Sequence, residues 1–77
     1  QRELADDHPI KTIYTRRMNT ITQYLHRGTL DEQTAAVMKR LAKDKLECAI
    51  FDHEYAKGSY EAEMSQDVLL KEAQAII

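Results

Sequence analysis

The sequence predicts an all-α fold, an antiparallel helical hairpin followed by a third helix. Apolar residues recur at three- and four-residue steps along most of the chain, which places them on one face of a helix. The 77 residues include only two glycines and one proline, so few positions interrupt a helix. With 43% hydrophobic and 31% charged residues, the composition is that of a folded protein. The helices can form a small three-helix bundle or extend into a homodimer.

The first helix is expected at residues 9–27, after a polar lead over residues 1–8. Asp6 and Asp7 precede Pro9. An acidic residue followed by proline is a good helix start, because the carboxylate accepts unpaired amide protons and proline needs no donor in the first turn. Gly28 favours a left-handed cap after the last residue. The apolar face consists of Ile10, Ile13, Tyr14, Met18, Ile21, Tyr24 and Leu25.

The second helix is expected at residues 30–57. Thr29 and Glu32 have the spacing of a capping box, in which each side chain binds the other residue's amide. The connection to the first helix is therefore a tight turn, and a short connection makes the two helices antiparallel.

Two neighbouring apolar stripes run along this second helix. So wide an apolar surface predicts contact with more than one neighbour, either the rest of the chain or a second copy of it. One stripe comprises Leu30, Val37, Leu41, Cys48, Phe51 and Tyr55, and the other comprises Ala35, Met38, Ala42, Leu46 and Ala49.

The third helix is expected at residues 59–75, with Gly58 as the preceding break and Ser59 as the N-cap. A single glycine is also tolerated inside a helix, so the second helix could instead continue through Gly58. In that case one apolar stripe would be exposed unless another chain covered it, and this stripe is the candidate interface. It consists of Tyr60, Met64, Val68 and Leu69.

Residues that commonly carry chemistry are few and scattered. His8, His26 and His53 lie on different segments and lack the helical spacing of metal ligands, so we expect neither a metal nor a cofactor. Cys48 is expected to be a buried, inert thiol. No nucleophile motif or phosphate-binding loop occurs in the sequence. These observations predict a protein that is not an enzyme.

The two halves of the chain carry opposite charge. Residues 8–45 contain eight Lys and Arg against three acids, and residues 46–77 contain two against seven. The asymmetry can serve packing within the chain, packing between chains, or binding to a larger protein partner. A further alternative is nucleic-acid binding by the basic hairpin, although the isoelectric point of 5.9 and the short turn argue against it. Its candidate contacts, equally available to an acidic partner, are Arg16, Arg17, Lys39, Arg40 and Lys43.

The function predicted from the sequence is that of a non-enzymatic helical interaction or oligomerisation domain, with nucleic-acid binding as the alternative. A homodimer is the favoured assembly. No apolar run reaches the length of a membrane span, which favours a cytoplasmic protein. A first residue other than Met and an uncapped apolar end at Ile76 and Ile77 favour a segment of a larger or regulatory protein.

Overall fold

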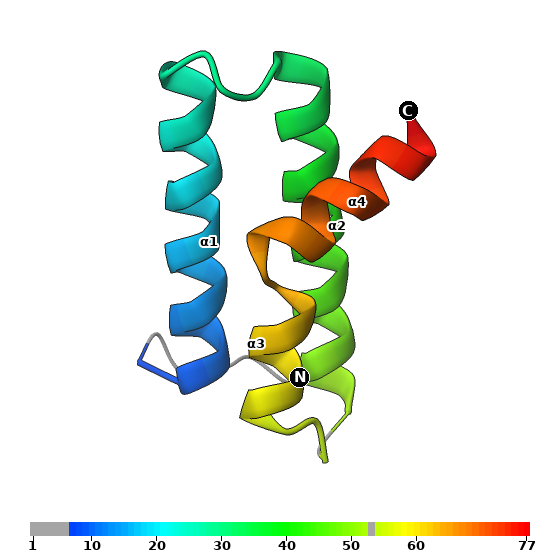
Figure 1. Ribbon diagram of the computed structural model, residues 1–77. Coiled ribbons are helices and arrows are strands. Elements are labelled where there is room, and N and C mark those ends of the chain that lie inside the picture. The colour runs from blue at the N-terminus through cyan, green and yellow to red at the C-terminus, as the bar shows by residue number, and fades with distance from the viewer. Residues whose placement is uncertain (1–6, 53) are drawn as a thin grey trace.

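The computed structural model describes residues 7–52 and 54–77, and within them the chain forms four α-helices and no strand. Helix α1 (Pro9–His26) and helix α2 (Glu32–Phe51) stand side by side as an antiparallel hairpin (Figure 1). Helix α3 (Lys57–Glu63) packs against α1, and helix α4 (Gln66–Ile76) crosses α2. The predicted all-α class and the hairpin are confirmed, but the described residues form four helices instead of three.

Helix α1 begins where the sequence predicts, with Pro9 in the first turn, but with a different cap. The Nδ1 atom of His8 accepts a hydrogen bond from the Ile10 amide at 3.2 Å. The predicted acidic cap is therefore wrong for Asp7, which is exposed, and Asp6 lies outside the described residues. A neutral imidazole nitrogen can satisfy one of the free amides of the first turn in the same way as a carboxylate.

The turn after α1 is built on Gly28, whose φ of +80° lies in the left-handed region. The Thr29 amide donates to the Tyr24 carbonyl at 3.0 Å, and the Gly28 amide donates to the Leu25 carbonyl at 3.1 Å. This is the paired arrangement of a Schellman motif, so the predicted glycine cap is confirmed.

The predicted capping box at Thr29 is wrong, because the Thr29 amide belongs to the cap of α1. The N-cap of α2 is Asp31, whose carboxylate accepts a hydrogen bond from the Thr34 amide at 3.3 Å. The hydrogen bonds with Thr34 hold the pKa of Asp31 below its usual value. Leu30, expected in the first turn of the helix, instead lies in the connection between α1 and α2, with its side chain buried.

Helix α2 ends at Phe51, well before the predicted residue 57. Asp52 has an extended backbone, and its Oδ1 accepts a hydrogen bond from the Glu54 amide at 3.0 Å. A carboxylate that binds a nearby amide in this way competes with helix continuation. The break therefore precedes the predicted one, and Gly58 lies inside α3.

The predicted third helix is divided at Ser65. Helix α3 ends at Glu63, and Ser65 Oγ accepts a hydrogen bond from the Val68 amide at 3.2 Å as the N-cap of α4. Serine is among the preferred N-cap residues, so this position can start a new helix. The change in direction lets Tyr60 on α3 and Leu69 on α4 both reach the core.

The core lies between the hairpin and the two short helices. On α2 the buried stripe is the alanine-rich one that includes Ala35, Met38, Ala42 and Ala49. Its small side chains allow close approach of neighbouring helices. The core consists of Ile10, Ile13, Ile21, Leu30, Ala35, Met38, Ala42, Ala49, Tyr60, Met64, Leu69 and Ala73.

The stripe predicted as an interface with another chain is mostly internal. Tyr60, Met64 and Leu69 are fully buried by the chain itself, and Val68 is half-buried. The fold-back of α3 and α4 over the hairpin provides this cover (Figure 1). The expectation that Tyr60, Met64 and Leu69 lie open to a partner is therefore corrected.

Candidate functional site

Arg17 on α1 forms hydrogen bonds that connect the hairpin to the junction between α3 and α4. Its Nε donates to the Met64 carbonyl at 2.6 Å, and its Nη1 donates to Gln66 Oε1 at 3.1 Å. The guanidinium thereby binds one of the unpaired carbonyls at the C-terminal end of α3. Arg17 is half-buried and fully engaged within the chain, so it is poorly placed to meet a phosphate.

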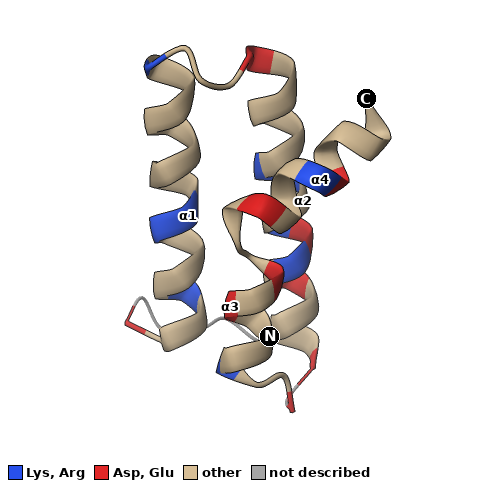
Figure 2. Cartoon of the chain, viewed as in Figure 1, with Lys and Arg blue, Asp and Glu red and all other residues tan. Residues whose placement is uncertain are grey.

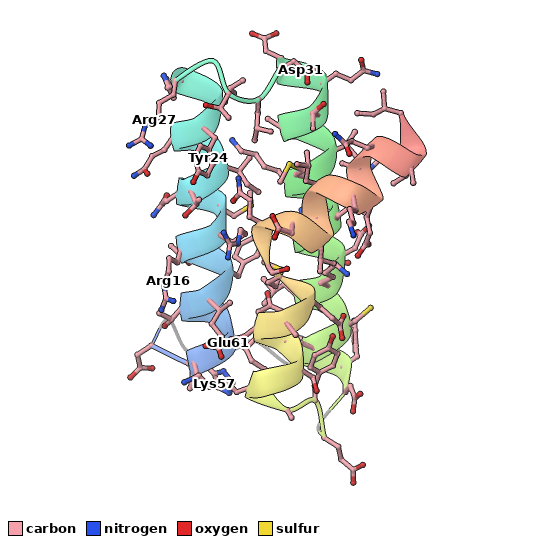
Figure 3. The ribbon with its side chains drawn as sticks, viewed as in Figure 1. Arg16, Tyr24, Arg27, Asp31, Lys57 and Glu61 are labelled. Atoms are coloured by element: carbon pink, nitrogen blue, oxygen red, sulfur yellow. The ribbon has the colours of Figure 1, made fainter. Side chains whose placement is uncertain are left out.

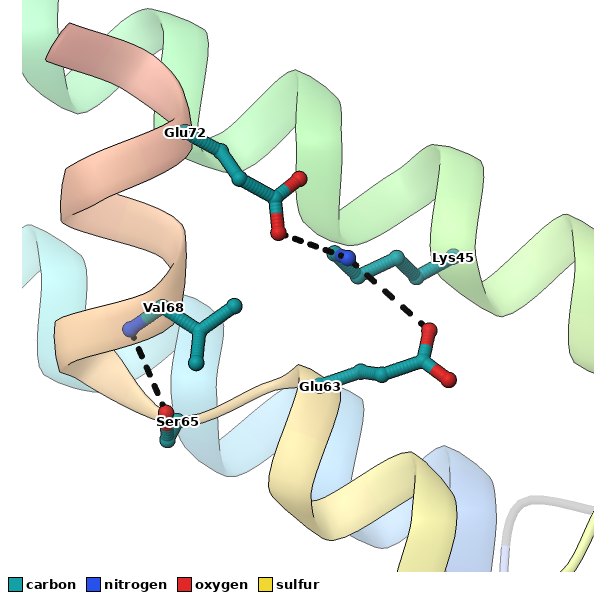
Figure 4. A network of polar contacts seen from close by, with 5 residues as sticks. All are labelled: Lys45, Glu63, Ser65, Val68 and Glu72. Carbon is teal, nitrogen blue, oxygen red and sulfur yellow. Dashed lines mark hydrogen bonds and ion pairs between the residues drawn. The ribbon is translucent and has the colours of Figure 1, made fainter. Parts of the chain in front are cut away.

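Lys45 on α2 joins the basic hairpin to the acidic helices. Its Nζ lies 3.1 Å from Glu72 Oε2 and 3.9 Å from Glu63 Oε1 (Figure 4). The Lys45 side chain is only 16% exposed. The Lys45 contacts are the internal pairing that the opposite charges of the two halves favour, whereas Arg17 binds neutral acceptors in the acidic half.

The five candidate cations do not form one patch. Arg16 projects from the side of α1 away from α2 (Figure 3), over an open hollow of about 380 Å³ that it lines with Thr12, Thr15 and Asn19. Lys39 is half-buried on α2. Arg40 and Lys43 are exposed on the same helix but share it with carboxylates, so α2 bears both signs of charge (Figure 2).

The outer face of α2 holds the most exposed aromatic side chain in the described part of the chain. Phe51 is 73% exposed and lies beside Cys48, which is also exposed. The two residues line an open hollow of about 690 Å³. Its remaining lining is acidic, from Asp44, Glu47 and Asp52. The lining of the hollow therefore combines two apolar side chains with three carboxylates.

The expectation that Cys48 is buried is wrong. Cys48 belongs to the stripe of α2 that also contains Val37, Leu41 and Phe51, and only part of that stripe packs inward. Val37 and Leu41 are half-buried against the core, whereas Cys48 and Phe51 are exposed. Helix α4 packs against α2, but it does not cover the C-terminal end of the stripe, where Cys48 and Phe51 lie.

A smaller hollow of about 230 Å³ lies at the connection between α2 and α3. Tyr55 lines it together with Asp52, Glu54 and Glu63. Burial, with a smaller contribution from Glu63, raises the pKa of Tyr55 to about 12. Within the described ranges, no three His, Cys, Asp or Glu side chains are grouped to hold a metal ion.

One family model matches nearly the whole chain, residues 1–76, and it describes a family of unknown function, DUF6076. The chain belongs to this family. No curated protein and no solved structure matches the chain.

In this DUF6076 chain, the outer face of α2 is the strongest candidate site. Sequence reasoning placed Cys48 and Phe51 on an apolar stripe but gave no role to Asp44 or Asp52. The signal that could have found the surface is side-chain size, because the alanine-rich stripe permits the closest helix packing and so takes the inward position. Among the described residues no helix is both long and apolar enough to cross a bilayer.

Proposed function

We propose that this chain is a non-enzymatic helical interaction domain that self-associates through the outer face of α2. The observation that carries the proposal is the 73% exposure of Phe51 beside the exposed thiol of Cys48. An aromatic ring is a common anchor of protein interfaces, because burying it removes a large apolar area from water. The carboxylates around it add selectivity for a partner surface that carries positive charge.

A second copy of the chain supplies a surface that carries positive charge. The same helix that presents Phe51 and the nearby carboxylates also presents Arg40 and Lys43, which are both exposed. Nucleic-acid binding has weaker support, since Arg17 is engaged within the chain and Asp44 and Glu47 lie next to the α2 cations. The proposal includes a cytoplasmic setting, where a lone exposed cysteine remains reduced.

The test is sedimentation equilibrium over a wide range of protein concentration, comparing the parent chain with Phe51→Ser. We expect the parent to self-associate and Phe51→Ser to weaken association about tenfold or more, equivalent to about 1.4 kcal/mol. The folded state should tolerate the change, because Phe51 contributes little to the core.

The matched control is Ile77→Ser, which removes another exposed apolar side chain, 54% exposed, at the C-terminal end of α4. This variant should associate like the parent. A parent chain that stays monomeric at every concentration overturns the proposed function. Equal effects of the two substitutions overturn the assignment to α2.

A further inference from the structure

Four charged residues follow one another along the outer face of α2 in a definite order. Arg40 and Lys43 come first, and Asp44 and Glu47 follow toward the C-terminal end. All four side chains are exposed. Within residues 7–52 and 54–77, none of them makes an ion pair or hydrogen bond. Their charge is therefore available to another molecule.

The order of these charges is unfavourable for pairing within the helix. Arg40 and Asp44 are four residues apart, as are Lys43 and Glu47, with the cation first in each pair. Ion pairs at this spacing are stronger when the acidic residue comes first. The face therefore has a positive half toward its N-terminal end and a negative half toward its C-terminal end.

We propose that this face binds the same face of a second copy, with the two α2 helices antiparallel and a two-fold axis passing between Lys43 and Asp44. The inference rests on the proposed function and specifies the geometry of the self-association. In this arrangement Arg40 lies opposite Glu47 of the second copy, and Lys43 lies opposite Asp44. The two-fold axis repeats each pair, as in an isologous interface.

The same alignment gives Phe51 a place to pack. Opposite it lies Ala36 of the second copy, an exposed residue whose small side chain leaves room for an aromatic ring. Val37, half-buried beside it, extends the apolar contact. A parallel arrangement would instead place Arg40 opposite Arg40 and Glu47 opposite Glu47, which is repulsive.

The size of the face indicates a weak, reversible dimer. Helix α2 has 20 residues, a length of about 30 Å, and a single helix pair buries less than the roughly 1,200 Å² of a stable standard interface. Dissociation constants in the micromolar range or above are expected for such contacts. The experiments therefore use concentrations suited to solution NMR.

The first experiment exchanges the charges. One variant carries Arg40→Glu and Lys43→Glu, and the other carries Asp44→Lys and Glu47→Lys. Each alone should associate at least tenfold more weakly than the parent, because like charges then face each other. An equimolar mixture of the two should associate at least as strongly as the parent. The matched controls are Lys71→Glu and Asp67→Lys, exposed charges on α4, which should leave self-association unchanged.

The second experiment locates the partner helix without altering its charges. The chain has one cysteine, the exposed Cys48, so a nitroxide spin label attaches at a single site. Spin-labelled chain is mixed with unlabelled ¹⁵N-enriched chain, and amide broadening in the ¹⁵N copy is measured. The antiparallel arrangement predicts the strongest broadening around Lys39 and Arg40.

The outcomes separate this inference from the proposed function. Broadening centred on Cys48 itself indicates parallel helices, and broadening outside α2 indicates a different surface. Either result overturns the antiparallel arrangement while self-association through the domain stands. Failure of the two charge-exchanged variants to associate with each other also overturns it. Absence of any self-association in the parent overturns both proposals.

Discussion

Tyr60 is the largest fully buried side chain, and its hydroxyl has no hydrogen-bond partner among the described residues. The ring itself is well placed, packed edge-on against Tyr55 with 6.0 Å between ring centroids. Burial raises the pKa of Tyr60 well above its usual value, because a charged phenolate would lose its hydration. An unpaired buried hydroxyl lowers the stability of the folded state.

Replacing Tyr60 with Phe should therefore stabilise the protein. The change keeps the buried ring and removes the unpaired hydroxyl, so we expect the free energy of unfolding in urea to rise by about 1 kcal/mol. Tyr24→Phe, at a half-exposed ring, should leave it unchanged and serves as the control. A clear loss of stability in Tyr60→Phe would show that the hydroxyl has a partner that stabilises the fold.

At the scale of single residues, the sequence predicts which positions are apolar better than it predicts which of them are buried. Met38 and Phe51 both belong to apolar stripes of α2, yet one is fully buried and the other is 73% exposed. Periodicity gives the faces of a helix, whereas the position of its neighbours decides which face is covered. That position depends on contacts with α1 and α4, which periodicity alone does not encode.

At the scale of helices, the feature best predicted from the sequence is the glycine cap of α1. Only one glycine, Gly28, lies near the end of α1, and the left-handed backbone there needs a glycine. The other ends are less certain from sequence because several capping residues compete. Asp31 caps α2 in place of Thr29, and Ser65 starts a helix although Ser59 is the more prominent candidate beside a glycine. Local spacing allows each of these caps, and tertiary packing selects among them.

The two glycines should respond oppositely to substitution by alanine. Gly58 lies inside α3, and a methyl group added there would meet no other atom within 4 Å. Gly58→Ala should therefore raise the free energy of unfolding by about 0.5–1 kcal/mol. Gly28→Ala should lower it by about 1–2 kcal/mol, because φ is +80° there. Thermal and urea unfolding followed by circular dichroism measure both. Destabilisation by Gly58→Ala would contradict its helical assignment.

At the scale of the whole molecule, two side chains of the hairpin hold the second half of the chain in place. Arg17 binds the α3–α4 junction, and Lys45 lies between carboxylates of both helices. The charge asymmetry is visible in the sequence, but its use within the chain is not. Sequence reasoning left open whether the acidic half folds back or reaches another chain, because both arrangements satisfy the same pattern.

Lys45→Gln should lower the free energy of unfolding by about 1 kcal/mol at low salt, since it removes a cation shared by Glu63 and Glu72. The difference from the parent should shrink at 1 M salt, where charges are screened within about 3 Å. Lys71→Gln, at an exposed cation of α4, is the matched control and should have no measurable effect. Equal effects of the two substitutions would mean that the Lys45 contacts contribute nothing specific.

The contacts of Arg17 also bear on the order in which the chain assembles. They connect residues that are 47 and 49 positions apart, whereas the hairpin closes through a short turn at Gly28. Closing the longer loop costs roughly 2 kcal/mol more in chain entropy than closing the turn. Chain entropy therefore favours closure of the hairpin before α3 and α4 dock. Until they dock, the part of the α2 surface that α4 covers is open to water.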